Sequence, residues 1–162
     1  MKYKIFVDGQ EGTTGLKIHE RLASRDDLEI LKIDPDKRKD INERRKLINQ
    51  SDIVFLCLPD DAAKESVSLI ENSKTRVIDA STAHRTAEGW TYGLPELKKE
   101  QRELIAKSNR VAVPGCHATG FILLVAPLVE KGILHSDYPV TCCSVSGYSG
   151  GGKKLISKFD DG

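Results

Sequence analysis

The 162-residue sequence has no excess of charge of either sign, and it has no long hydrophobic run. It carries 25 Lys and Arg residues against 24 Asp and Glu residues, which gives a net charge of +1. Proteins that bind nucleic acid or a membrane surface usually carry a basic patch, so this balance argues against both kinds of partner. The apolar run at residues 121–129 is interrupted by Pro127 and is too short to cross a membrane.

Cysteines are few, and they lack the spacing of a metal site. Cys57, Cys116, Cys142 and Cys143 form no Cys-x-x-Cys pair, so we expect neither a structural zinc site nor a disulfide framework. The N-terminus runs directly into an apolar strand pattern at residues 3–7, which leaves no room for a signal peptide. These absences favour a metal-free protein of the cytoplasm.

Apolar strand patterns alternate with helical patterns along the first two thirds of the chain. Strands are expected at residues 3–7, 28–33, 52–57, 76–79 and 110–113. Residues 52–57 are nearly all apolar, as a parallel strand buried on both faces requires. The alternation predicts an α/β fold with a doubly wound parallel sheet, in which ligands bind at the carboxyl ends of the strands.

Three glycines, Gly9, Gly12 and Gly15, lie between the first expected strand and a helical pattern. A strand, a glycine turn and a helix in this order are typical of a dinucleotide site, because the turn brings the backbone close to a pyrophosphate. The hydroxyls of Thr13 and Thr14 are further candidate donors. The spacing alone would also fit an ordinary turn, but the flanking strand and helix favour the cofactor site.

The cofactor's identity is left open by the end of the second expected strand. Asp34 lies 19 residues after Gly15, where an acidic residue commonly binds a ribose hydroxyl and favours NAD. Lys37, Arg38 and Lys39 follow at once and would suit the 2′-phosphate of NADP, or would simply face solvent.

Other strand ends should meet the glycine turn at the same crevice. We expect Leu58, Pro59 and Ser81 to border the cofactor there, and Asp60 to cap the next helix.

Cys116 follows the expected strand 110–113, after Pro114 and Gly115, and precedes an apolar helix. Gly115 should free the backbone for a sharp strand-to-helix turn. Unpaired N–H groups at a helix start favour a thiolate, so Cys116 is a candidate nucleophile. The alternative is a small buried side chain at a turn.

The last part of the chain is predicted to contain a strand at residues 138–146 and a glycine-rich segment at 147–154. These elements are too few to bury a second core. Gly147, Gly152 and Lys153 have the spacing of a phosphate-binding P-loop, but Lys154 stands where a hydroxyl must bind magnesium.

Five blocks together resemble the N-acetyl-γ-glutamyl-phosphate reductases of arginine biosynthesis, in the shorter type of that family. The blocks are residues 9–15, 79–85, 92–97, 114–120 and 146–153, in the order the family has them. The resemblance implies a Rossmann domain at 1–116, followed at 117–162 by the incomplete start of an α+β substrate domain like that of glyceraldehyde-3-phosphate dehydrogenase.

The resemblance also implies an activity and a set of site residues. NADP, with NAD as the alternative, would serve an oxidoreductase that reduces an acyl phosphate to an aldehyde through a thioester on Cys116. The substrate-binding candidates are His84, Arg85, Ser146, Ser149, Gly150 and Lys153. The full-length protein is expected to be a homo-oligomer.

The chain is about half as long as members of that family, and their acid/base histidine would lie beyond residue 162. We therefore expect a fragment. Aspartate-semialdehyde dehydrogenase shares the chemistry and remains an alternative, as do a P-loop hydrolase and a nucleotide-binding module without catalysis.

Overall fold

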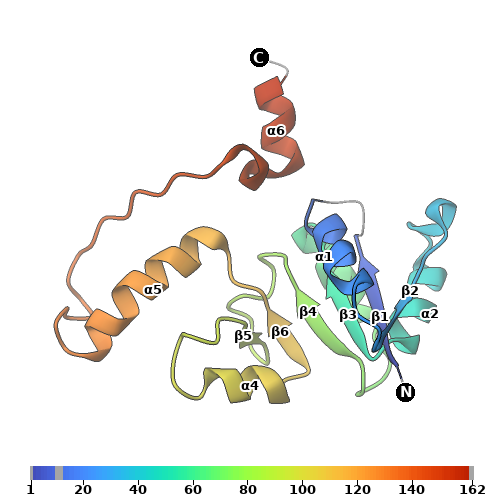
Figure 1. Cartoon of the computed structure of the whole chain (residues 1–162), viewed down its shortest axis with the longest axis horizontal. Helices are drawn as coiled ribbons and strands as arrows, with labels where there is room; N and C mark the ends of the chain where they lie inside the picture. Colours follow the sequence, from blue (N-terminus) through green and yellow to red (C-terminus); the bar gives the residue numbers. More distant parts are fainter. Residues whose placement is uncertain (1, 10–12, 161–162) are drawn as a thin grey trace.

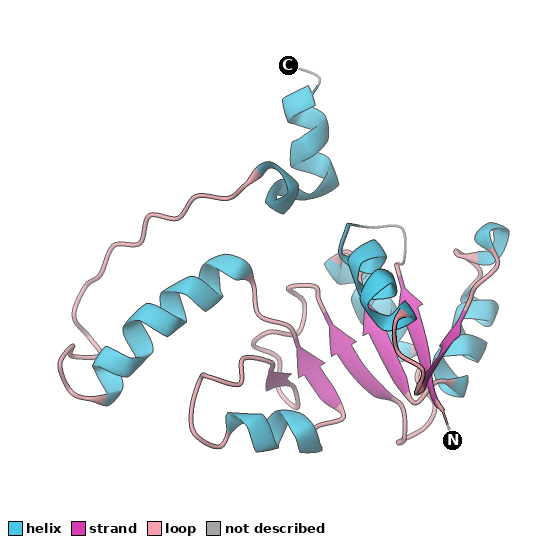
Figure 2. Cartoon of the chain, viewed as in Figure 1, coloured by secondary structure: helices cyan, strands magenta, loops and turns pink. Residues whose placement is uncertain are grey.

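Six strands of the described chain form one parallel sheet (Figures 1 and 2). The computed structural model describes residues 2–9 and 13–160, and for residues 13, 149 and 151–155 it describes the backbone alone. Neighbouring strands are parallel throughout, in the order β2-β1-β3-β4-β6-β5. The strands are β1 (Tyr3–Asp8), β2 (Leu28–Leu31), β3 (Ile53–Leu56), β4 (Arg76–Asp79), β5 (Thr91–Tyr92) and β6 (Arg110–Ala112). The predicted doubly wound α/β sheet is confirmed.

Helices connect the strands and cover both faces of the sheet. They are α1 (Thr13–Ala23), α2 (Ile41–Gln50), α3 (Asp60–Ser68) and α4 (Gln101–Lys107), with a 3-10 turn η1 (Pro35–Lys37) before α2. The chain moves from β1 to β2 in one direction and from β2 to β3 in the other. Because such crossovers are right-handed, α1 lies on one face and α2 and α3 on the opposite face.

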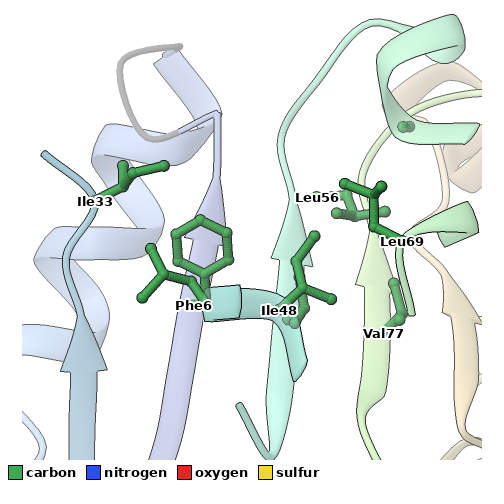
Figure 3. Close-up of a cluster of buried hydrophobic side chains, with 9 residues drawn as sticks. Phe6, Ile33, Ile48, Leu56, Leu69 and Val77 are labelled. Atoms are coloured by element: carbon green, nitrogen blue, oxygen red, sulfur yellow. The ribbon is translucent and has the colours of Figure 1, made fainter. Parts of the chain in front are cut away.

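The core lies between the sheet and the helices α2 and α3, which cover one of its faces. Phe6, Val54 and Val77 are in register on β1, β3 and β4, and each is fully buried. Ile48 of α2 packs against them, as Figure 3 shows, and Ala63 of α3 belongs to the same cluster. Burying each large apolar side chain contributes about 1.5–3 kcal/mol, so this cluster stabilises the packing of α2 and α3 on the sheet.

The prediction that Asp60 caps α3 was wrong. The residue before the helix is Pro59, and no side chain caps it. The Asp60 carboxylate instead accepts hydrogen bonds from the backbone N–H (2.9 Å) and the hydroxyl of Thr82, which follows β4. A tertiary partner has therefore replaced the local cap.

The predicted strand at residues 138–146 was also wrong, because residues 139–147 form no regular structure. A strand needs a neighbour for its N–H and C=O groups, and this segment runs between α5 (Cys116–Glu130) and the turn η2 (Tyr148–Gly151), away from the sheet (Figure 1). The chain ends in α6 (Gly152–Asp160). Among the described residues, no helix combines the length and the apolar character that a membrane crossing requires.

Candidate functional site

A cavity of about 640 Å³ opens at the carboxyl ends of β1 and β3. Its wall includes Gly9 after β1, and Cys57, Leu58 and Pro59 after β3. The strand order reverses between β1 and β3, and that switch point is where doubly wound sheets bind ligands. The structure thus brings together Gly9, Leu58 and Pro59, three of the residues that we expected to border a cofactor.

Gly9 is held in a conformation that only glycine adopts readily. Its φ is +89°, and a Cβ added there would lie 2.3 Å from the carbonyl oxygen of Cys57. The missing side chain therefore lets β1 turn directly against the end of β3. Gly12 lies outside the described residues, whereas Thr14 and Gly15 lie with Thr13 in the first turn of α1. That turn presents backbone N–H groups, as an anion site requires.

Of the basic residues expected at a 2′-phosphate, Arg38 and Lys39 line the same cavity. Asp34 does not line it, and its carboxylate accepts a hydrogen bond from the backbone N–H of Asp36 at the start of η1 (3.0 Å). Lys37 forms the last residue of η1. Of the two alternatives that the sequence left open, the cavity wall therefore includes two of the three basic residues and not Asp34.

A buried ion pair that the sequence analysis missed lies between β1, α2 and α3. Arg44 donates to Asp8 through Nε (3.3 Å) and Nη2 (3.1 Å), to Ser66 through Nη2 (2.6 Å) and to Glu65 through Nη1 (2.6 Å). Burial by itself would lower the pKa of the Arg44 guanidinium, but the Asp8 charge and the hydrogen bonds raise it overall. The signal was available in the sequence, because Arg44 precedes the buried Leu47 and Ile48 by three and four residues, which places it on their face of the helix.

The Cys57 thiol also lines the cavity, but it is a poor nucleophile. Burial raises its pKa to about 11, and the nearby carboxylates of Asp79 and Asp8 add to this effect. The thiol therefore stays protonated near neutral pH, and Cys57 acts as part of the wall.

A second polar cluster follows β4. Asp79 is fully buried, and its carboxylate accepts hydrogen bonds from the backbone N–H (2.9 Å) and hydroxyl (2.6 Å) of Ser81. The Nδ1 atom of His84 lies 2.6 Å from the same carboxylate. Ser81, expected at the cofactor, and His84, expected at the substrate, thus both face Asp79 in this structure.

Arg85 lies against the turn that leads into α5. Its Nε donates to the carbonyl oxygen of Val113 (3.1 Å). Gly115 has an ordinary extended backbone, with φ −77° and ψ 151°, so the expected strand-to-helix turn does not use the conformational freedom of glycine. The Arg85 guanidinium occupies the space beside Gly115, because a Cβ there would lie 2.7 Å from its Nη1. The guanidinium therefore rests on the residue that immediately precedes Cys116.

Cys116 is the first residue of α5 and is exposed, and its thiol forms no disulfide. It follows β6 at the carboxyl edge of the sheet, the edge on which the Gly9 cavity opens. The side chain of the next residue, His117, contacts Ser144, with Nδ1 and Oγ 2.5 Å apart. Cys116 is therefore accessible at a helix N-terminus, as a nucleophile must be.

The other substrate candidates lie in and around η2 and α6. Ser146 and Gly150 both contact the carbonyl oxygen of Gly147, through the hydroxyl (3.4 Å) and the backbone N–H (2.9 Å). The side chains of Ser149 and Lys153 lie outside what the structure describes.

Comparisons with known proteins show which family the sequence matches. Residues 4–105 match the family model "Semialdehyde dehydrogenase, NAD binding domain", and residues 116–161 match "Semialdehyde dehydrogenase, dimerisation domain". The chain is 57% identical to the N-acetyl-gamma-glutamyl-phosphate reductase of Trichormus variabilis, over 98% of this chain and 49% of the relative. The chain is 56% identical to the Mesorhizobium japonicum reductase, over 98% of this chain and 52% of the relative. The chain thus spans about half the length of these relatives.

Solved structures share the fold. A Vibrio cholerae aspartate semialdehyde dehydrogenase II matches 99% of this chain and 51% of its own, with a TM-score of 0.65 at 13% identity. The Candida albicans aspartate semialdehyde dehydrogenase, solved with NADP, matches 81% of this chain and 48% of its own, with a TM-score of 0.59 at 17% identity. At these identities the likeness concerns the fold alone.

Proposed function

The chain belongs to the semialdehyde dehydrogenase family, and from this we propose that it forms the cofactor-binding half and the nucleophile of an N-acetyl-γ-glutamyl-phosphate reductase. The observation that carries the proposal is the place of Cys116. It is exposed at the N-terminus of α5, beside Arg85, at the sheet edge where the Gly9 cavity opens. The names of the similar reductases support the choice of substrate.

The cavity suits a nicotinamide dinucleotide. The Gly9 turn leaves room for close approach to a pyrophosphate, and the first turn of α1 follows it. We propose that Arg38 and Lys39 bind the 2′-phosphate of NADP, because both line the cavity and Asp34 does not. When bound, NADPH supplies the hydride that takes the acyl group to the aldehyde.

The Cys116 sulfur carries the acyl group in this proposal. Its thiolate attacks the carbonyl carbon of the acyl phosphate, an S–C bond forms, the C–O bond to phosphate breaks, and inorganic phosphate leaves. Backbone N–H groups of Cys116 and His117 lie at the start of α5, where they can stabilise the oxyanion. After reduction, the C–S bond breaks, which releases N-acetylglutamate semialdehyde and restores the thiolate.

Arg85 is the proposed clamp for an anionic group of the substrate, since a guanidinium binds a carboxylate or phosphate through two parallel hydrogen bonds. We further propose that Ser146, Ser149, Gly150 and Lys153 contribute to a phosphate subsite, and that residues 117–162 begin the substrate domain. The match of residues 116–161 to a dimerisation domain supports a homo-oligomer.

The P-loop alternative does not fit the structure. The segment at 147–154 follows residues without regular structure, whereas a P-loop follows a strand of the sheet.

The test is a steady-state assay of the full-length protein. We expect it to oxidise N-acetylglutamate semialdehyde with NADP and phosphate, and to prefer this substrate to aspartate semialdehyde. Cys116→Ser should abolish turnover, and the matched variant Cys142→Ser should retain it. Replacing Arg38 and Lys39 with glutamine should raise KM for NADP about tenfold or more and leave KM for NAD nearly unchanged. Full activity of Cys116→Ser, or a preference for aspartate semialdehyde, would contradict the proposal.

A further inference from the structure

A buried histidine lies one residue before the proposed anion clamp. His84 is 8% exposed, and its ring stacks on Trp90 with the ring centroids 4.0 Å apart and the planes inclined by 12°. On its other side, Nδ1 lies 2.6 Å from the Asp79 carboxylate, which is fully buried at the end of β4. An ionised carboxylate only accepts hydrogen bonds, so Nδ1 is assigned as the donor in this contact. His84 is thus fixed at both its edge and its face.

The segment that contains His84 has no helix or strand of its own. Residues 80–90 run as turns between β4 and β5, so side-chain contacts decide where each residue lies. Thr82 is held by Asp60, and among the described residues the Arg85 side chain has one hydrogen bond, from Nε to the Val113 carbonyl oxygen. A long, flexible side chain with one such contact is held in place mainly by the backbone from which it extends.

We propose that His84 is a positioning residue, which through Asp79 holds the Arg85 guanidinium beside Cys116 as a binding group for an anion of the substrate. The inference rests on the proposed function, which assigns Arg85 to the substrate. It adds that the rigid anchor is Asp79: β4 fixes this carboxylate, the carboxylate fixes the His84 ring, and the ring fixes the backbone of the next residue. A Cβ on Gly115 would lie 2.7 Å from Nη1 of Arg85, so the guanidinium lies against the residue that precedes Cys116 in the chain.

The Asp79 bond and the Trp90 stack can be separated by substitution. His84→Phe keeps a ring that stacks on Trp90 but loses the donor to Asp79. His84→Asn loses the ring but keeps an amide N–H near the position of Nδ1. If the bond positions Arg85, the asparagine variant should behave like the parent and the phenylalanine variant should not.

The readout is the alkylation of Cys116 in the full-length protein, followed by peptide mass spectrometry. Iodoacetate carries a carboxylate and iodoacetamide does not, so the ratio of their rates reports a cation beside the thiol and cancels changes in the thiol itself. We expect Arg85→Gln to lower this ratio about fivefold. His84→Phe should lower it to nearly the same value, whereas His84→Asn should keep most of it. Inorganic phosphate should protect the parent from iodoacetate more than it protects Arg85→Gln.

A matched control is His135→Phe, which removes an exposed histidine that contacts Asp137 and should leave the ratio unchanged. Circular dichroism identifies a variant that fails to fold. If His84→Phe fails to fold, the alkylation ratio of His84→Asn, compared with those of the parent and Arg85→Gln, decides the outcome. In turnover, His84→Phe should raise KM for the acyl phosphate and leave KM for NADPH unchanged, which a loss of folded protein would not do.

The outcomes separate the two proposals. An unchanged ratio in Arg85→Gln would overturn the anion clamp, and the positioning role would fall with it. A lowered ratio in Arg85→Gln together with unchanged ratios in both His84 variants would overturn the positioning role alone. Equal losses in the two His84 variants would show that the bond to Asp79 is not what positions Arg85, and would also overturn the inference.

Discussion

The buried ion pair between Arg44 and Asp8 offers the sharpest test of what stabilises the wall of the Gly9 cavity. Replacing Arg44 with methionine keeps most of the side-chain volume and removes the charge together with its donors. The side chains of Arg44 and Asp8 are only 8% and 7% exposed. The substitution therefore leaves a carboxylate inside the protein with little access to water.

The size of the effect follows from what Asp8 would lose. Of the four side-chain hydrogen bonds of Arg44, two are with Asp8, one is with Glu65 and one is with Ser66, so Asp8 loses two donors. After the substitution the Ser66 hydroxyl, at 2.8 Å, still donates to Asp8. Removing one member of a buried pair costs about 3–5 kcal/mol, because the remaining charge stays desolvated. We expect Arg44→Met to lose a free energy of unfolding in that range.

Urea unfolding followed by the fluorescence of Trp90, which is the single tryptophan, measures this loss. Arg25→Met is the matched control: Arg25 pairs with Asp27 at 2.6 Å, but both side chains are more than half exposed, so the urea midpoint should barely move. The double variant of Asp8→Asn and Arg44→Met should be more stable than Arg44→Met, since no charge remains buried. A loss below about 1 kcal/mol for Arg44→Met would refute this reasoning.

Three further predictions concern single positions. Gly9→Ala should cost about 2 kcal/mol or more and abolish NADPH binding in a fluorescence titration, because its Cβ would meet a backbone carbonyl at 2.3 Å and φ is +89°; unchanged binding would argue against a tight turn. Iodoacetamide at pH 8 should modify Cys57 at least about 100-fold more slowly than a cysteine in an unstructured peptide, because its pKa is raised to about 11; equal rates by mass spectrometry would disagree. The hydrogen bonds from Thr82 lower the pKa of Asp60 below its ordinary value of 3.8. The contribution of Asp60 to stability is therefore complete above that value and is lost as the pH falls through the folded pKa. The melting temperatures of Asp60→Asn and the parent should converge in acid, and a difference in melting temperature that is independent of pH would exclude the mechanism.

Sequence patterns predicted the parts of the fold whose signals are local. Apolar runs located β1, β3 and β4 within a residue or two, and the glycine turn between β1 and α1 indicated the cavity. The strand β5 was missed because its two residues are too few to show a pattern, and pairing with β6 alone defines it.

The polar contacts that shape the site could be predicted only in part. Arg44 lies on the inward face of α2, and a charged residue there implies a buried partner. Which carboxylate it meets depends on how α2 packs against β1, and no local pattern records that. The pairing of His84 with Asp79 spans only five residues, yet Ser81 competes for the same carboxylate, so the turn geometry decides it.

The region after Cys116 shows that an apolar pattern forms a buried helix or a strand only where another part of the protein packs against it. Residues 121–126 are apolar on every side, a pattern typical of a buried helix, yet Leu124 is 75% exposed and none of α5, all of which is described, is buried. Likewise, the pattern at residues 138–146 would form a strand only beside another strand. In the sheet, each predicted strand has its partner within the described chain, and there the patterns succeeded. A pattern therefore specifies an element only together with the surface that buries it, which is why the structure of residues 1–116 is predicted better than that of the last forty-six residues.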